Sequence, residues 1–316
     1  LLPELEREWS DELRAWVAGG QQTAYDAAVG ALGRAIMRWA GIPGTPAAKT
    51  RWARRQAQIV DGFGVPYSPE FLLALLNRRW SDRHAAKLIE AVREGRLHPD
   101  EGTALHAWAH HRDRDGELLT ARQAGVELQN SFRPMIAVAR FVAFAAKELH
   151  DRPEWRERIA AEVAERGRLV GGELATMFAQ ERGRTAPVVP SLHACATTDA
   201  ELDGQRVPEG GDAREWPRAD AFEPERFRGV EDYEALAAFV PHGGADVATG
   251  HRCPGEKLAI AGLAASISVL SDPRIRIRGR GLDVNRRRMP TKPRSGGRVR
   301  RADAPSACPF HRGSRA

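Results

Sequence analysis

A single cysteine stands in a glycine-rich stretch, FVPHGGADVATGHRCPGE, that runs from Phe239 to Glu256. Cys253 comes shortly before an apolar, helix-like pattern from Leu258 to Leu270. The unpaired N–H groups and the dipole at the start of that helix favour a thiolate over a thiol. The glycines let the backbone turn tightly and lie close to a flat group, and Pro254 suits an early helix position. A thiolate held in this way is what a haem iron takes as its proximal ligand.

A second group that could do chemistry lies in the stretch from Thr120 to His150. This stretch predicts one long, largely buried helix with Thr120 as its N-cap. Pro134 removes a backbone hydrogen bond and predicts a kink. Arg133, beside the kink, is costly to bury unless it meets an anion, either an internal carboxylate or a bound ligand. Arg140 lies on nearly the same face of the helix and competes for the ligand role.

Spacing alone leaves Cys253 open between an iron ligand and a small buried apolar side chain. The G-H-R-C-P-G-E loop, however, resembles the cysteine-ligand loop of the cytochrome P450 superfamily. With the upstream P-x-G-G-x-D it is most similar to the hydrogen-peroxide-dependent fatty-acid peroxygenase (fatty-acid alpha/beta-hydroxylase) branch. The N-x-x-R-P run that ends in Arg133 and Pro134 resembles the same branch. Ordinary members of the superfamily carry an acid–threonine pair there, used in dioxygen activation, and this stretch has no such pair.

The resemblance implies a role for each of these residues. Cys253 would be the axial ligand of the iron in haem b. His251 and Gly255 would belong to the haem-binding loop, with His251 at the position that contacts a haem propionate. Arg133, followed by Pro134, would hold the carboxylate of a fatty-acid substrate, since the planar guanidinium grips a carboxylate in two places and stays charged. Hydrogen peroxide would be the oxidant co-substrate, so no redox partner is expected.

The implied reaction is hydroxylation of a long-chain fatty acid at the alpha or beta carbon. The thiolate ligand favours cleavage of the O–O bond of peroxide, and the substrate carboxylate transfers the proton. Two alternatives stay open: oxidative decarboxylation to a terminal alkene, and a truncated, non-catalytic haem-binding remnant. A monooxygenase fed by a redox partner is disfavoured, because the acid–threonine pair is missing from the central helix.

Weaker motifs precede the cysteine loop in the order that the superfamily has. Glu181 and Arg184 form an E-x-x-R pair that shares one helix face. Arg226 lies in a later P-E-R-F motif. Each motif alone carries little information, but their order strengthens the resemblance. It implies that the three side chains form a buried structural cluster behind the haem.

Two parts of the family pattern are not found. The chain begins where similar proteins have already built an N-terminal, β-rich part, and an internal strand is missing after Gly210. We therefore expect an N-terminally truncated, cytochrome P450-like fold that is mainly α with a minor β component. It would form one haem-thiolate domain over residues 1–300, followed by a basic tail over residues 301–316.

Apolar spacing predicts helices over most of the chain. The expected segments are residues 1–40 with a break at Gly19-Gly20, and residues 52–63, 71–80, 82–94, 120–150 and 153–185. Two short β elements are expected, a hairpin over residues 202–207 and an edge strand over residues 273–278. His106 and His110 share a predicted helix face at a metal-ligand spacing. No third ligand accompanies them, so a solvated helix end is the favoured interpretation.

Composition indicates a soluble, globular protein, with 42% hydrophobic and 28% charged residues in a chain of 316. No apolar run approaches the roughly 18 residues of a membrane span, and no signal peptide is visible. Three cysteines are too few for a disulfide framework, so a cytoplasmic location is expected. The net charge of +6 lies largely late in the chain, and residues 298–316 predict a mobile, basic end. No nucleic-acid-binding motif accompanies that charge, so no nucleic-acid partner is expected.

Overall fold

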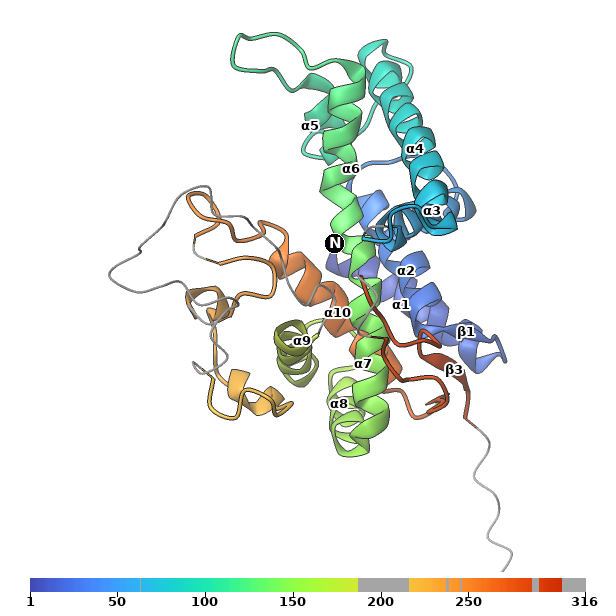
Figure 1. Ribbon diagram of the computed structural model, residues 1–316, viewed down its shortest axis with the longest axis vertical. Helices are drawn as coiled ribbons and strands as arrows, with labels where there is room; N and C mark the ends of the chain where they lie inside the picture. Colours follow the sequence, from blue (N-terminus) through green and yellow to red (C-terminus); the bar gives the residue numbers. More distant parts are fainter. Residues whose placement is uncertain (63, 187–215, 237–238, 245, 286–289, 303–316) are drawn as a thin grey trace, which may run out of the picture.

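Helices form most of the structure, and a long line of helix runs through its middle (Figure 1). The computed structural model describes residues 1–62, 64–186, 216–236, 239–244, 246–285 and 290–302. Within these ranges the α-helices are α1 (Leu2–Val17), α2 (Ala24–Trp39), α3 (Pro46–Asp61), α4 (Pro69–Arg93), α5 (Ala104–His110), α6 (Ala121–Ala137), α7 (Ala139–Asp151), α8 (Pro153–Arg166), α9 (Glu173–Thr185) and α10 (Glu256–Leu270). The 3-10 helices η2 (Pro224–Phe227) and η3 (Tyr233–Ala235) lie between α9 and α10 in the sequence.

Short polar side chains determine where many of these helices begin. At the start of α2, α3, α4, α5 and α6 a hydroxyl accepts the backbone N–H three residues further on; these residues are Thr23, Thr45, Ser68, Thr103 and Thr120. At α6 the bond is reciprocal, because the Gln123 side chain accepts the backbone N–H of Thr120 at 3.1 Å. The predicted N-cap at Thr120 is therefore confirmed. Thr45 and Pro46 likewise explain why α3 begins earlier than the predicted residue 52.

The two helices predicted over residues 71–80 and 82–94 are one continuous helix, α4. Ser81 lies between the predicted segments and is fully buried. Its hydroxyl accepts a hydrogen bond from the indole Nε1 of Trp52 on α3 at 3.2 Å. A residue at which the sequence pattern predicts a break in the helix thus has its hydroxyl hydrogen-bonded by a neighbouring helix, and α4 continues through it.

The single long helix predicted from Thr120 to His150 is divided into α6 and α7 at Val138. Pro134 cannot donate a backbone hydrogen bond, which loosens the helix at this point. One turn later the Val138 N–H is shared between the carbonyls of Pro134 at 3.3 Å and Met135 at 3.2 Å. The helix axis nevertheless continues in nearly the same direction from α6 into α7 (Figure 1). The expected disturbance by Pro134 is present, but as a short irregularity rather than a sharp bend.

Helix α10 packs against α6 through a small residue. A Cβ atom at Gly262 of α10 would lie 2.8 Å from the sulfur of Met135 on α6, and 3.3 Å from Leu32 on α2. A larger residue at Gly262 would require the side chains of Met135 and Leu32 to move. The helix that follows the cysteine loop is therefore held close to the helix that carries Arg133.

A small antiparallel sheet, with strand order β1-β3-β2, lies beside the helices (Figure 1). The strands are β1 (Gln22–Thr23), β2 (Ile275–Ile277) and β3 (Arg298–Arg301). In the register, Val299 is opposite Gln22 on one side and Ile277 on the other. The edge strand predicted over residues 273–278 is confirmed as β2.

The prediction that residues 298–316 form a mobile end is wrong for Arg298–Arg301. These residues form β3, the central strand of the sheet, because its two neighbours pair with both of its edges. Val299 is 3% exposed and anchors the strand, while Arg298 and Arg301 point to solvent. The strand was not predicted because arginines fill its more exposed positions and leave Val299 as its one buried residue.

Some predictions fall outside the described residues. These are the hairpin over residues 202–207, the missing strand after Gly210, and the part of the tail over residues 303–316. Among the helices of the described ranges, none is both long enough and apolar enough to cross a membrane.

Arg140 of α7 is a buried cation, with 1% of its side chain exposed, and it forms an ion pair with Asp61 of α3. The Asp61 carboxylate also accepts a hydrogen bond from the Tyr25 hydroxyl at 3.0 Å and lies 3.3 Å from Lys292. Burial raises the pKa of Tyr25, so its hydroxyl stays protonated and remains a donor. Two other nitrogens of Arg140 have no hydrogen-bond partner among the described residues, so Asp61 supplies most of its compensation.

We expect Asp61→Ala to lower the free energy of unfolding by about 3 kcal/mol, because it leaves the buried Arg140 without a partner. Urea denaturation followed by circular dichroism measures this change. Asp11→Ala is the matched control, since Asp11 pairs with Arg14 at the surface and should cost less than about 1 kcal/mol. Equal losses in the two variants would show that the buried pair has no special importance.

Candidate functional site

Cys253 lies immediately before α10, as predicted, and the helix has Gly255 as its N-cap residue. The helix begins at Glu256, two residues earlier than its apolar pattern suggests, and Pro254 therefore precedes it rather than occupying its first turn. The backbone N–H of Cys253 donates to the His242 carbonyl at 3.0 Å. The cysteine side chain is partly accessible, so it is not the fully buried apolar side chain that was the alternative.

The loop before Cys253 is closed by close backbone contacts. Gly243 has a φ of +94°, and a Cβ atom there would lie 2.0 Å from the carbonyl oxygen of His251. The His251 N–H donates to the Gly244 carbonyl at 3.1 Å. Asp246 accepts the backbone N–H of Thr249 at 3.0 Å, and backbone hydrogen bonds of this kind lower the pKa of Asp246. The loop shape therefore requires glycine at position 243, while the side chain of His251 stays exposed.

A buried ion pair attaches the loop to the helix that follows. Arg252 and Glu256 are 4% and 0% exposed, and their charged groups lie 2.9 Å apart. Arg252 also donates to the Phe239 carbonyl at the start of the loop, at 3.2 Å. This ion pair was not predicted from the sequence, although two opposite charges four residues apart around a cysteine can indicate such a pair.

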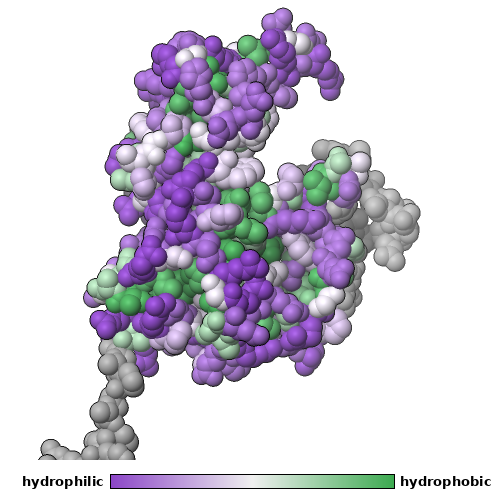
Figure 2. All heavy atoms as spheres, turned by 180° about the vertical axis from the view of Figure 1, so that it is seen from behind, coloured by the Kyte–Doolittle hydropathy of each residue, from purple (hydrophilic) through white to green (hydrophobic). Residues whose placement is uncertain are grey.

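The residues around Cys253 fit a haem group. An accessible thiol before a helix N-terminus suits a thiolate ligand. Val240 and Val247 of the same loop are 46% and 41% exposed, although both are apolar. Figure 2 shows an apolar area at the floor of a hollow between the part of the molecule that contains this loop and the part that contains α3 to α5. A flat, largely apolar cofactor would cover such surfaces.

Arg133 lies half-buried on α6, and the neighbouring Pro134 is exposed. Its Nε donates to the side-chain oxygen of Gln56 on α3 at 2.8 Å, and its Nη2 donates to that of Gln129 at 3.3 Å. No ion pair with a carboxylate involves Arg133 in the described part of the chain, whereas Arg140 pairs with Asp61. Burial, with the nearby charge of Arg78 as a smaller cause, lowers the pKa of Arg133, and the charge of Asp82 only partly opposes this. Of the two arginines that competed for a ligand, Arg133 is thus the one without a directly paired carboxylate.

The elements that carry Cys253 and Arg133 are joined, although no hydrogen bond or ion pair of the described residues links the two side chains. Helices α6 and α10 meet where Met135 approaches Gly262. The ring of Phe141 on α7 lies 5.6 Å from the ring of His242 in the cysteine loop. The two groups are therefore held by one packed unit without a direct bond between them.

The structure brings Glu181, Arg184 and Arg226 together. The Glu181 carboxylate is fully buried and accepts two hydrogen bonds of 2.8 Å from the Arg184 guanidinium. The Nε of Arg226 lies 3.3 Å from the same carboxylate, which also accepts the backbone N–H of Glu223 at 2.8 Å. Next to this cluster, Pro241 of the cysteine loop lies in van der Waals contact with the position of Gly183. The three side chains thus form one buried cluster, and its place behind a haem stays a prediction.

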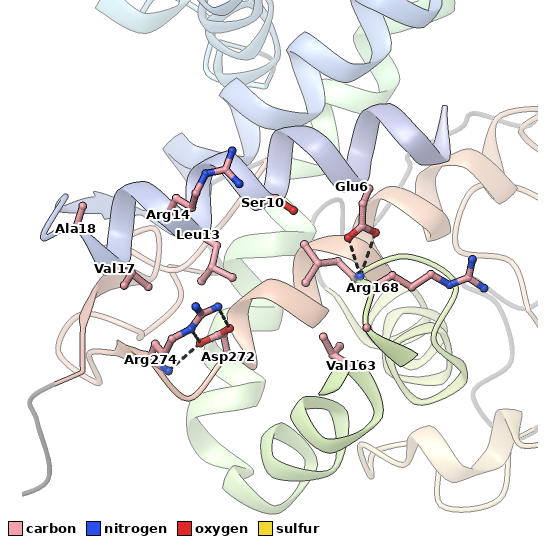
Figure 3. Close-up of a pocket in the computed structure, with 12 residues that line it drawn as sticks. Glu6, Ser10, Leu13, Arg14, Val17, Ala18, Val163, Arg168, Asp272 and Arg274 are labelled. Carbon is pink, nitrogen blue, oxygen red and sulfur yellow. Dashed lines mark hydrogen bonds and ion pairs between the residues drawn. The ribbon is translucent and has the colours of Figure 1, made fainter. Parts of the chain in front are cut away.

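Other candidate positions do not join this site. The rings of His106 and His110 lie 4.5 Å apart, but the described residues contain no group of three side chains that could hold a metal ion. A cavity of about 610 Å³ lies between α1 and the turn after α8 (Figure 3). Its Glu6 accepts the backbone N–H of Leu169 at 3.0 Å, and its Asp272 pairs with Arg274 at 2.8 Å. None of the predicted site residues lines this cavity.

Comparison with known proteins gives similarity over nearly the whole chain. No protein-family model matches it. The solved structure of cytochrome P450SP alpha (CYP152B1) in complex with (R)-ibuprophen is 32% identical, with a TM-score of 0.79 over 95% of this chain and 74% of that chain. Cytochrome P450EX alpha (CYP152N1) with myristic acid is 30% identical, with a TM-score of 0.77 over 95% and 73%. A variant of cytochrome P450 OleT in complex with arachidonic acid is 26% identical, with a TM-score of 0.80 over 96% and 74%.

We expect Glu181→Gln to lower the free energy of unfolding by about 3 kcal/mol, since it leaves two arginines in the protein interior without a full counter-charge. Thermal or urea unfolding measures the loss. Glu225→Gln is the matched control, because Glu225 pairs with Arg158 and Arg228 at the surface and should change stability by less than about 1 kcal/mol. If Glu181→Gln unfolds like the wild type, the cluster does not stabilise the fold.

Proposed function

The chain belongs to the cytochrome P450 family, within its CYP152 group, and from this premise we propose that it is a haem-thiolate peroxygenase of long-chain fatty acids. Membership of the family makes it a haem-dependent oxidoreductase. The observation that carries the finer proposal is Arg133, a half-buried cation with only neutral partners beside an exposed proline. Two similar structures contain fatty acids, myristic acid and arachidonic acid. A fatty-acid carboxylate is the anion that would complete the site.

Cys253 would ligate the haem iron, with His251 and Gly255 in the loop around it. Bound haem with a thiolate ligand supplies cleavage of the O–O bond of peroxide. The buried pair of Arg252 and Glu256 fixes the loop against α10, so that the sulfur keeps one position. Preorganisation of this kind lowers the cost of binding a rigid group.

Arg133 would bind the substrate carboxylate through both terminal nitrogens and orient the acid chain in the hollow. Its charge also keeps that carboxylate ionised. An ionised carboxylate held there can accept a proton from hydrogen peroxide and return it to the departing oxygen. The acid therefore replaces the acid–threonine pair of other family members, and no redox partner is required.

Oxidation beside the carboxylate would give a hydroxy acid. Oxidative decarboxylation to a terminal alkene is the alternative outcome of the same binding mode, since the same carbon atoms lie nearest the reacting centre. Analysis of the products of the peroxide reaction separates the two.

We expect the wild-type protein, supplied with haem, reduced and exposed to carbon monoxide, to give the red-shifted Soret band typical of thiolate ligation. Cys253→Ala should lose that band, because it removes the sulfur ligand. The absorption spectrum of folded protein, with circular dichroism as the check of folding, measures the difference. A wild type that is folded but lacks the band would contradict the proposed cofactor site.

We expect Arg133→Ala to reduce kcat/KM for myristate with hydrogen peroxide by roughly 10- to 100-fold, the worth of charge-assisted hydrogen bonds. The variant should retain haem, since Arg133 does not lie in the cysteine loop. Arg79→Ala, which removes an exposed arginine of α4, is the control and should retain its activity. Full activity of Arg133→Ala, or activity of the wild type only with a reductase, would contradict the proposal.

A further inference from the structure

Two buried glutamines surround the guanidinium of Arg133. Gln56 of α3 and Gln129 of α6 are both 0% exposed, and their amides bond to each other, Nε2 of Gln56 donating to Oε1 of Gln129 at 2.8 Å. The oxygen of Gln56 accepts from Arg133 Nε at 2.8 Å, and that of Gln129 accepts from Arg133 Nη2 at 3.3 Å. Both amide oxygens thus point at one cation, from two different helices.

A carboxylate outside this pair sets the direction of both amides. The Nε2 of Gln129 donates to Asp82 of α4 at 2.9 Å and to the Gly125 carbonyl at 3.2 Å. Since the nitrogen of Gln129 is engaged in this way, its oxygen must face Gln56 and Arg133. The nitrogen of Gln56 is then used by Gln129, which leaves its own oxygen for Arg133. The chain of bonds has one consistent direction, and reversing either amide would place N–H groups against the guanidinium.

The same arrangement leaves Arg133 without a carboxylate in direct contact, although the charge of Asp82 still acts on it from a distance. Asp82 is a nearby carboxylate, but it forms its ion pair with Arg78 at 3.0 Å, and Gln129 stands between it and Arg133. The protein therefore meets the hydrogen-bonding needs of the guanidinium with neutral atoms and gives it no directly paired counter-charge. Burial of a cation in this state is costly, so the site gains by binding an anion.

The bonds to Arg133 also leave its outer edge for a ligand. An arginine has five N–H groups. The described residues engage one of these at Nε, one at Nη2 and, through the longer contact of 3.5 Å with Asn130, one at Nη1. One N–H then remains on each terminal nitrogen, the pair that a carboxylate engages in bidentate fashion.

We infer that Gln56 and Gln129 are positioning residues for Arg133, which hold its guanidinium through uncharged oxygens so that its charge and outer edge serve a carboxylate ligand. This inference rests on the proposed function and extends it from the anchor to the residues that make the anchor selective. The selectivity is for the ionised head group and not for the hydrocarbon chain. The affinity for a neutral ligand of the same length should therefore not depend on these glutamines.

The test measures dissociation constants by isothermal titration calorimetry on the full, haem-loaded chain, for myristate and for its neutral analogue 1-tetradecanol. Gln56→Glu places a carboxylate on Arg133 and should weaken myristate binding by roughly tenfold or more. Gln56→Met removes the amide oxygen without adding charge and should weaken it by roughly three- to tenfold. Binding of 1-tetradecanol should change by less than about twofold in both variants.

Gln58→Glu is the matched control, because it makes the same change of charge on the same helix. Gln58 is exposed and accepts a hydrogen bond from Asn77 at 2.8 Å. This variant should bind both ligands within about twofold of the wild type. Thermal unfolding of each variant checks its folding, and Gln56→Met carries the test if Gln56→Glu does not fold.

The outcomes separate the inference from the proposed function. If the wild type binds myristate no better than 1-tetradecanol, the carboxylate anchor itself is wrong. If Arg133→Ala loses the preference for myristate but both Gln56 variants keep it, the inference about the glutamines is wrong while the anchor stands. Equal weakening of both ligands by the Gln56 variants would also overturn the inference, since it would indicate a purely structural role.

Discussion

Burying a guanidinium is costly unless something negative compensates it, and this constraint governs how the helices are joined. Arg182 of α9 pairs with Glu148 of α7 at 2.8 Å, and burial lowers the pKa of Arg182 to about 10. Arg140 of α7 pairs with Asp61 at the end of α3. Arg156 donates instead to the carbonyl of Leu270, the last residue of α10, where the helix dipole is negative, and to that of Asp272 just beyond it. Each of these cations links two elements of the fold through its hydrogen bonds or ion pair.

Arg133 is treated differently, and the difference connects the fold to its function. Its partners supply hydrogen bonds but no charge, because Gln129 separates it from Asp82. The fold gives this buried cation its hydrogen bonds but no directly paired carboxylate. An anionic ligand that binds to Arg133 would therefore stabilise the folded protein. Arg133 thus departs from the pairing of buried cations with negative groups that Arg140, Arg156 and Arg182 show, as is common where a protein binds its ligand.

The parts of the fold that were predictable from sequence have local causes. Thr120 caps α6 with its own hydroxyl, and Cys253 precedes α10 because an apolar helical pattern starts just after it. The missed features depend on residues that are distant in the chain. Asp61 lies 79 residues from Arg140, and Gln56 lies 77 residues from Arg133. The motifs in the sequence were therefore enough to name the candidate site residues. The hydrogen-bond partners of Arg133, Gln56 and Gln129, could be identified only once the helices were packed together.

The cysteine loop with Cys253 and the helix with Arg133, the two halves of the site, are attached to the protein independently. The cysteine loop is attached through its own buried ion pair and through Pro241, which packs at Gly183 of α9. Arg133 is attached to α3 and to its own helix through the glutamines. The close packing of α6 on α10 at Met135 and Gly262, and the contact of Phe141 on α7 with His242 of the cysteine loop, relate one half to the other. The position of a substrate head group relative to the iron ligand would thus depend on packing contacts that include neither Arg133 nor Cys253 themselves.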